Sequence, residues 1–182
     1  KERFEFNTDL TRDLRGLSAR WSPKNLYLKI DYGSPEDLTG LTFQDTLILF
    51  DYDSPDHGLR RVSPVTQWDR GVERQVLIRH WFVHGKRSHY DVEVRNEQGE
   101  VVSHFSASGF DKPVYPHFDM LDIIQEGSNS IVISLARDLL ELRNKEKIFL
   151  QVCTFKGGIE THEEKERPRR SHVDGHAVYY VA

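Results

Sequence analysis

The fold is decided by two runs of residues, Asn25-Leu-Tyr-Leu-Lys-Ile-Asp-Tyr32 and Thr46-Leu-Ile-Leu-Phe-Asp51. In the first run, apolar side chains alternate with Tyr27 and Lys29, as in a strand that buries one face. The second run is continuously apolar from residue 47 to residue 50, which is typical of a strand covered on both faces. Both runs predict β-structure, and the second predicts a strand deep inside a sheet.

The rest of the chain continues this pattern. Three strands joined by short turns are predicted at residues 75–83, 89–95 and 100–106, and later strands at 130–135, 147–155 and 176–181. The leucine spacing predicts a short helix over residues 136–143. Pro113 and Pro116 favour a long loop or a short edge segment between residues 110 and 127, because proline donates no hydrogen bond to a sheet.

About nine strands and one short helix predict an all-β fold, an antiparallel β-sandwich of jelly-roll-like character, with an open barrel as the alternative. At 182 residues the chain is long enough for one sizeable core, so we expect a single domain over residues 1–182. The charged segment 156–174 is expected to be a polar loop within that domain.

The composition argues against two kinds of partner. Charged residues make up 30% of the chain and the net charge is only -4, so we expect no nucleic-acid partner. No run approaches the ~18 to 20 consecutive apolar residues that span a bilayer, so we expect no membrane insertion. The one cysteine, Cys153, lies on the opposite parity to Val152 in an apolar run and is interpreted as a buried core residue rather than a nucleophile.

Four segments, taken in order, resemble a known group of β-sandwich modules. They are Leu17 to Ile30, Leu47-Ile-Leu-Phe-Asp-Tyr-Asp53 with Gly58 downstream, Ile131-Val-Ile-Ser-Leu-Ala-Arg-Asp-Leu-Leu140, and Ile148-Phe-Leu-Gln-Val-Cys-Thr-Phe155. Their order is similar to that in family 9 carbohydrate-binding modules, DOMON-like domains and the C-terminal domains of glucodextranase. The resemblance implies binding without catalysis, most often of a sugar and in some branches of haem. Asp51 is the best-matching position, whereas residues 54–75 and the tail depart from the pattern.

Calcium is the candidate metal. Asp51, Asp53 and Asp56 offer three carboxylates shortly before Gly58, and calcium prefers oxygen ligands of this kind. The spacing differs from that of an EF-hand. The alternative is an ordinary polar turn around Pro55, in which the aspartates bind backbone donors.

Two tryptophans are the candidate sugar platforms, because a flat ring packs against the apolar face of a pyranose. Trp68 lies in a polar segment with Arg70, and Trp81 lies in a predicted strand whose buried face the sequence leaves open. Arg70 and Tyr115 complete the predicted carbohydrate site. Trp21 is interpreted as a core residue instead.

Other chemistry is weakly indicated. His80, His84 and His89 could approach one another around a zinc ion, with scattered solvated or hydrogen-bonded histidines as the alternative. A haem could use Met120 and His117, with Met120 as a core residue as the alternative. Sequence motifs of hydrolases, zincins, kinases and dehydrogenases are missing, although a carboxylate pair for glycoside cleavage remains open.

We therefore expect a non-catalytic module that binds a polysaccharide or oligosaccharide. The chain begins with Lys1 and its only methionine is Met120, so we expect a processed protein or a piece of something larger. A single cysteine excludes an internal disulfide, which leans towards the cytosol, but for a carbohydrate-binding module we expect a larger exported protein, outside the cell or in the periplasm. The alternative is a structural or protein-interaction domain that packs on neighbouring domains through Trp68 and residues 110–115. A haem-binding DOMON-like domain is the third possibility.

Overall fold

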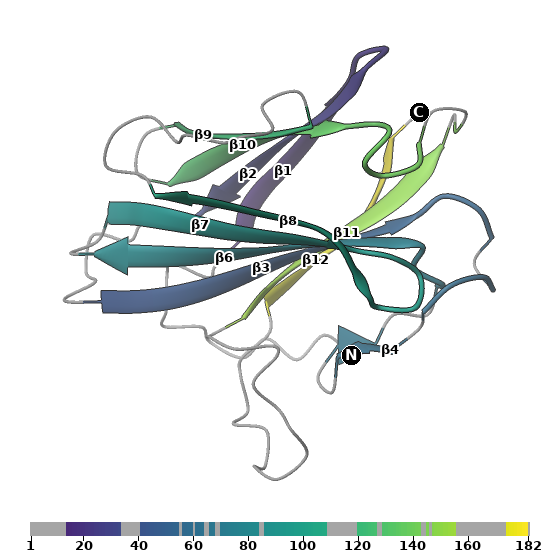
Figure 1. Ribbon diagram of the computed structural model, residues 1–182, viewed down its shortest axis with the longest axis horizontal. Coiled ribbons are helices and arrows are strands. Elements are labelled where there is room, and N and C mark those ends of the chain that lie inside the picture. The colour runs from purple at the N-terminus through teal and green to yellow at the C-terminus, as the bar shows by residue number, and fades with distance from the viewer. Residues whose placement is uncertain are drawn as a thin grey trace, which may run out of the picture.

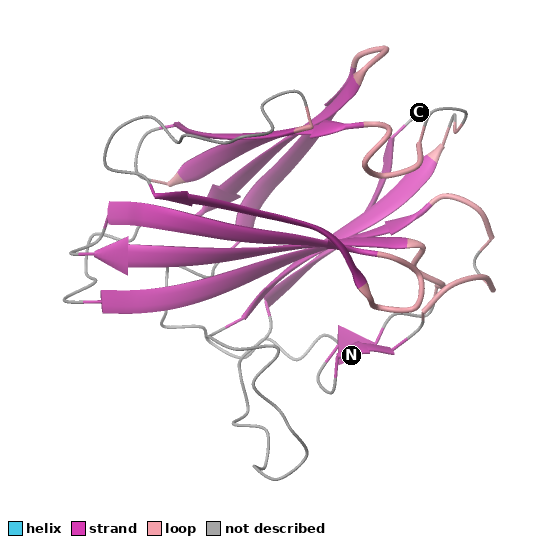
Figure 2. Cartoon of the chain, viewed as in Figure 1, coloured by secondary structure: helices cyan, strands magenta, loops and turns pink. Residues whose placement is uncertain are grey.

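A computed structural model describes residues 14–33, 41–54, 56–59, 61–63, 66–67, 70–83, 86–108, 120–126, 129–142, 145, 147–155 and 174–181. These residues form strands and loops and contain no helix (Figure 2). The strands are β1 (Leu14–Trp21), β2 (Asn25–Tyr32), β3 (Leu41–Asp51), β4 (Arg61–Ser63), β5 (Thr66–Gln67), β6 (Arg74–Val83), β7 (Lys86–Arg95), β8 (Val101–Ser108), β9 (Leu121–Glu126), β10 (Ser130–Ala136), β11 (Ile148–Phe155) and β12 (Asp174–Val181).

Two antiparallel sheets form two layers, which Figure 1 shows one above the other. The first has the strand order β1-β2-β10-β9, and the second has the order β12-β11-β3-β6-β7-β8. Strands β4 and β5 form a separate two-stranded sheet. The predicted all-β antiparallel β-sandwich is confirmed. The structure has more strands than the sequence predicted, because β1, β4 and β5 were not expected and β9 was expected only as one of two alternatives, a short edge segment or a long loop.

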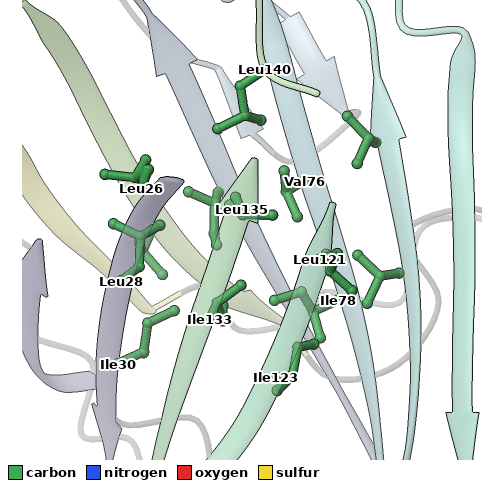
Figure 3. Close-up of a cluster of buried hydrophobic side chains, with 14 of the residues drawn as sticks. Leu26, Leu28, Ile30, Val76, Ile78, Leu121, Ile123, Ile133, Leu135 and Leu140 are labelled. Atoms are coloured by element: carbon green, nitrogen blue, oxygen red, sulfur yellow. The ribbon is translucent and has the colours of Figure 1, made fainter. Parts of the chain in front are cut away.

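The alternating residues of facing strands build the core between the two layers. Leu26, Leu28 and Ile30 of β2 are fully buried, and alternate residues of β10 and β6 are buried against them (Figure 3). Burying one such side chain stabilises the fold by roughly 1.5–3 kcal/mol. The period-2 pattern of the sequence therefore reports which face of each strand is inside.

Strand β3 is covered on both faces, as its continuous apolar run predicted. Ile48 and Phe50 belong to the core between the sheets. Leu47 and Leu49 point to the other face, where they pack with Val72 and other buried side chains in a second, smaller cluster. Cys153 is 1% exposed and belongs to this second cluster, whereas Val152 belongs to the first, so the prediction of a buried cysteine on the opposite parity is confirmed.

The prediction of a short helix at residues 136–143 is wrong, because the described residues of this segment form no helix. Residues 137–141 are turns, in which the amides of Leu139 and Glu141 bind carbonyls three residues earlier, at 3.1 Å each. Glu141 adopts a φ of 57°, a left-handed conformation that ends any helical run. The Arg137 side chain binds the Leu142 and Lys145 carbonyls, at 2.7 and 3.1 Å, and so holds the loop closed. The leucine spacing reflects burial of leucines in a tight loop.

The segment around residues 110–127 contains an edge strand. Strand β9 lies at the edge of the four-stranded sheet, which agrees with the short edge segment that the prolines favoured. Residues 109–119 and the polar segment 156–173 lie outside the described residues. Within the described ranges, no helix is long and apolar enough to cross a membrane.

Candidate functional site: a polar cleft at one end of the sandwich

A cleft of about 440 Å³ lies where β3 ends and β6 begins. Four separate segments line it: the loop after β3, the start of β6, the turn between β7 and β8 with the first residues of β8, and the loop between β10 and β11. Most of the lining side chains are charged or carry amides; they are Tyr52, Asp53, His57, Glu73, Arg74, Asn96, Glu97, Gln98, Val102, Glu141 and Lys145. The cleft is therefore a polar site assembled by loops on a rigid sheet.

Two glycines position the loop after β3. Gly58 has a φ of +89°, which side chains rarely adopt, and the amide of Leu59 donates to the Val72 carbonyl at 3.0 Å. A Cβ on Gly71 would lie 1.3 Å from the His57 carbonyl oxygen. Because the two backbones touch directly, His57 is held at the cleft by a contact that only glycine permits.

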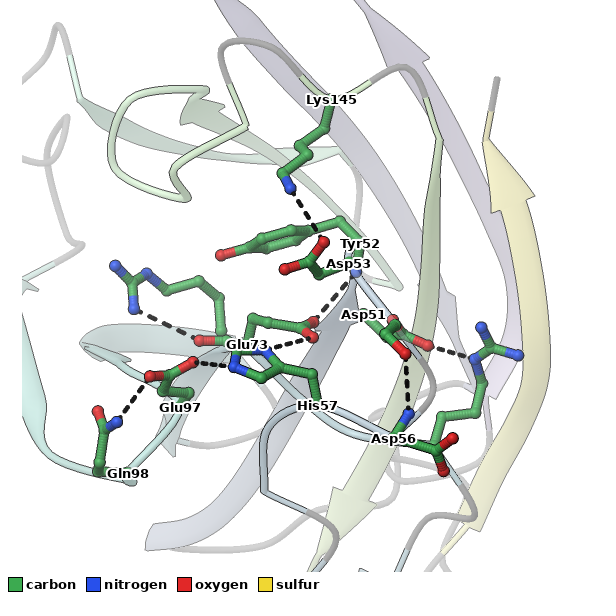
Figure 4. Close-up of polar contacts among 12 residues, drawn as sticks. Asp51, Tyr52, Asp53, Asp56, His57, Glu73, Glu97, Gln98 and Lys145 are labelled. Carbon is green, nitrogen blue, oxygen red and sulfur yellow. Dashed lines mark hydrogen bonds and ion pairs between the residues drawn. The ribbon is translucent and has the colours of Figure 1, made fainter.

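The imidazole of His57 lies between two carboxylates, as Figure 4 shows. Its Nδ1 is 3.5 Å from Oε1 of Glu73, and its Nε2 is 3.5 Å from Oε2 of Glu97. The Glu73 side chain is only 4% exposed, whereas His57 is 53% exposed. One histidine thus links a buried carboxylate to a carboxylate on the rim.

Glu73 is the most unusual ionisable group of the cleft. Burial raises the pKa of its carboxyl above the ordinary value, and the negative charge of Asp51 adds to this; the backbone amide of Tyr52, which donates to Oε2 at 3.1 Å, opposes it. Oε1 of Glu73 faces Nδ1 of His57 at 3.5 Å, a contact that also lowers the pKa, and no other donor reaches this oxygen among the described residues. A buried carboxylate oxygen with unused acceptor capacity marks a place where a ligand donor would be stabilised.

The other charges of the cleft are paired. Arg74 forms a close ion pair with Glu141, and Lys145 lies 3.5 Å from Asp53. The Lys145 ammonium also lies 5.4 Å from the centre of the Tyr52 ring. Burial raises the pKa of Tyr52 to about 12, so its phenol stays protonated and can donate a hydrogen bond. Glu73 and Glu97 have no such arginine or lysine partner among the described residues, and the side chain that lies beside both of them is His57.

The three aspartates predicted to bind calcium lie in different surroundings. Asp51 is 1% exposed and pairs with Arg70, whose guanidinium lies over the Phe149 ring, 3.8 Å from its centre. Asp53 faces Lys145 across the cleft, and Asp56 is exposed. Among the described residues, only Asp91, Glu93 and His104 bring three ligand atoms within 4.8 Å of one another. The structure therefore does not gather the three aspartates around one point, and calcium at this loop stays a prediction.

The predicted sugar-binding residues are not brought together either. Trp81 is 39% exposed on the outer face of β6. It lies seven residues beyond Arg74, which corresponds to about 23 Å along a strand. Arg70 binds Asp51 instead of facing the cleft, and Trp68 and Tyr115 lie outside the described residues. Of the predicted site residues that the structure describes, only Asp53 lines the cleft.

The structure decides two questions that the sequence left open. His80 is fully buried, binds the Thr46 hydroxyl at 3.1 Å and packs edge-to-face on Tyr90, so its face of β6 is the core. His84, His117 and the side chain of His89 lie outside the described part of the chain. Met120 is 38% exposed, so its interpretation as a core residue is wrong. Trp21 packs against the core, as predicted.

A second group of charges lies on the outer face of the six-stranded sheet. Arg79 binds Asp91 at 2.8 Å and Glu93 at 3.0 Å, and His104 binds Asp91 at 2.5 Å. The Arg79 guanidinium thus binds two of the three residues whose ligand atoms lie within 4.8 Å of one another. This group is therefore a network of ion pairs that joins strands β6, β7 and β8.

The fold and the site together define an all-β sandwich domain with a polar cleft at one end. Neither the protein-family models nor the curated proteins nor the solved structures gave a match to this chain. The resemblance to carbohydrate-binding and DOMON-like modules thus stays an expectation, and the function has to be argued from the cleft itself.

Proposed function

We propose that the chain is a non-catalytic carbohydrate-binding module and that the cleft is its sugar site. The observation that carries this proposal is the lining of the cleft, where the amides of Asn96 and Gln98 lie beside carboxylates, the Tyr52 ring and the apolar Val102. Planar polar groups bind the paired donors and acceptors of sugar hydroxyls, while an aromatic ring and an aliphatic side chain cover the apolar ring face. A volume of about 440 Å³ falls within the usual range of small-molecule sites.

The surroundings of the two carboxylates favour binding over cleavage. Glycoside hydrolases hold their two carboxyl groups on either side of the scissile bond, with the reacting sugar between them. Here the imidazole of His57 occupies that position, 3.5 Å from Glu73 and 3.5 Å from Glu97. A sugar bound in the cleft would contact these groups from one side, as a ligand does in a binding module.

The test is a glycan array, followed by calorimetric titration of any glycan that binds. Val102→Arg places a bulky side chain in the cleft, and Val101→Arg is its matched control, because Val101 is a similarly exposed neighbour that does not line the cleft. We expect Val102→Arg to abolish glycan binding and Val101→Arg to keep it, with the two melting temperatures alike.

The array is run once with calcium and once with chelator, which tests the predicted calcium site separately. Equal glycan binding by both arginine variants would show that the sugar binds outside the cleft. A lack of binding to every glycan in both buffers would reject the module and favour the interaction-domain alternative. Turnover of a bound oligosaccharide would show that the domain is a glycoside hydrolase and not a non-catalytic binding module.

A further inference from the structure

The charges of the cleft select among possible sugars. Four carboxylates line the cleft, from Asp53, Glu73, Glu97 and Glu141, but only Arg74 and Lys145 carry a fixed positive charge. Both cations are already used, because Arg74 pairs with Glu141 and Lys145 pairs with Asp53. Glu73 and Glu97 are the two carboxylates of the cleft that pair with neither Arg74 nor Lys145.

These two carboxylates flank one side chain. Each approaches a different ring nitrogen of the His57 imidazole at 3.5 Å, so an ammonium that enters beside this imidazole meets both negative charges at short range. His57 is 53% exposed, so a ligand can approach the two carboxylates from the open side of the imidazole. The buried Glu73 side chain is 4% exposed, and among the described residues only His57, at 3.5 Å, approaches its Oε1. An N–H donor of the ligand would satisfy that oxygen, and a positive charge would compensate its burial.

On the basis of the proposed function, we infer that the cleft prefers glycans with free amino groups, and that Glu73 and Glu97 hold the ammonium of such a sugar. An N-acetylated sugar has the same ring and hydroxyls but lacks the charge, and a uronic acid carries the opposite charge. The cleft should therefore bind the amine most tightly, the amide less tightly and the acid least, since like charges repel across a short distance.

The experiment is a calorimetric titration of the whole chain with three probes. They are oligosaccharides of β-1,4-linked glucosamine, their fully N-acetylated counterparts and oligogalacturonate. We expect the wild-type protein to bind the free amines at least about tenfold more tightly than the N-acetylated sugars at low salt, and this preference to shrink as salt is added. Glu73→Gln and Glu97→Gln should each lower the preference for the free amine over the N-acetylated sugar to about threefold or less.

Glu100→Gln is the matched control, because Glu100 is exposed near the same turn and does not line the cleft, and because glutamine keeps an oxygen acceptor for the Asn96 amide, which donates to Glu100 at 3.0 Å. It should keep the full preference. If Glu73→Gln folds poorly, Glu97→Gln decides, since Glu97 lies on the partly exposed turn between β7 and β8. Equal affinity for free and acetylated sugars, or an unchanged preference in Glu97→Gln, would overturn the inference while the sugar-binding proposal stands. Failure of all three probes and of the glycan array would overturn both.

Discussion

Gly71 lies so close to His57 that a Cβ on this glycine would be 1.3 Å from the His57 carbonyl oxygen. The contact joins the loop after β3 to the segment that enters β6, and these two segments carry His57 and Glu73 into the same cleft. The backbone contact thus determines the geometry of the site, although Gly71 has no side chain of its own to contribute.

We expect Gly71→Ala to destabilise the protein by about 3 kcal/mol, because the atoms that the new methyl group meets belong to backbone and cannot rotate away. The measurement is thermal or urea unfolding followed by circular dichroism. Gly16→Ala is the control, since its Cβ would meet only the carboxylate end of the flexible Asp31 side chain, at 2.8 Å. A loss for Gly71→Ala no larger than that for Gly16→Ala would show that the loop yields easily.

The pair of Asp51 and Arg70 predicts a second loss of stability. Asp51 is 1% exposed, so Arg70→Met removes the partner of a buried carboxylate while keeping an aliphatic side chain near Phe149. We expect a cost of about 3–5 kcal/mol in urea unfolding, because an uncompensated buried charge is left behind. The double variant with Asp51→Asn should regain part of it.

Lys145→Met is the matched control for this pair. It breaks an ion pair whose aspartate, Asp53, is 57% exposed, so it should cost no more than about 1 kcal/mol. If both methionine variants cost the same, the burial of Asp51 would not be the source of the effect.

The alternation of apolar and polar residues predicted the sandwich because most strands bury one face. It could not show which face is buried where both faces of a strand carry apolar residues. In β6, Val76 and Ile78 share a face with His80, while Leu77 shares the other face with Trp81. Both faces contain apolar residues, since β6 lies inside the larger sheet and is covered on both sides near its start. The sequence therefore could not decide whether Trp81 was buried.

The cleft could not be predicted because its residues come from four segments whose spatial relation depends on the sheet order. The turn at residues 96–99 was expected, but nothing local in the sequence places Glu97 opposite His57. Glu73 follows the loop segment without any motif around it, and its unusual pKa arises from burial by distant residues. The two glycines were the usable sequence feature, since Gly58 and Gly71 mark a loop that folds back on itself.

Cys153 should be unreactive in the native protein. Its side chain is 1% exposed in the cluster with Leu47 and Leu49, so a thiol reagent can reach it only when the sheet opens. We expect the labelling rate of native protein to be at least about a thousandfold below that of protein in strong denaturant, since closed states dominate by this factor or more at ordinary stability. Rapid native labelling would mean that the second cluster opens locally.

Glu73 should make the protein less stable as the pH rises. Its folded-state pKa is raised above the ordinary value of 4.5, mainly by burial, so the folded protein holds this proton more tightly than the unfolded chain does. Below pH 4.5 the carboxyl is protonated in both the folded and the unfolded state and does not change the free energy of unfolding. Above pH 4.5 the free energy of unfolding falls as the pH rises through the folded-state pKa. Glu73→Gln, which keeps an acceptor for the Tyr52 amide, should therefore be more stable than the wild type at neutral pH and lose this advantage in acid.

The measurement is the melting temperature of both proteins at a series of pH values between about 4 and 8, a range that spans the ordinary carboxyl pKa. The groups that face Glu73 are the Asp51 carboxylate, the backbone amide of Tyr52 and the His57 side chain, and Glu97 lies at the other ring nitrogen of His57. The same series in Glu97→Gln therefore separates the influence of that second carboxylate from burial. If Glu97→Gln keeps the fall in stability and Glu73→Gln removes it, the buried carboxylate is its source. A Glu73→Gln variant that is less stable than the wild type at neutral pH would instead mean that the ionised carboxylate holds His57 and the loop in place, and that this attraction outweighs the cost of burial.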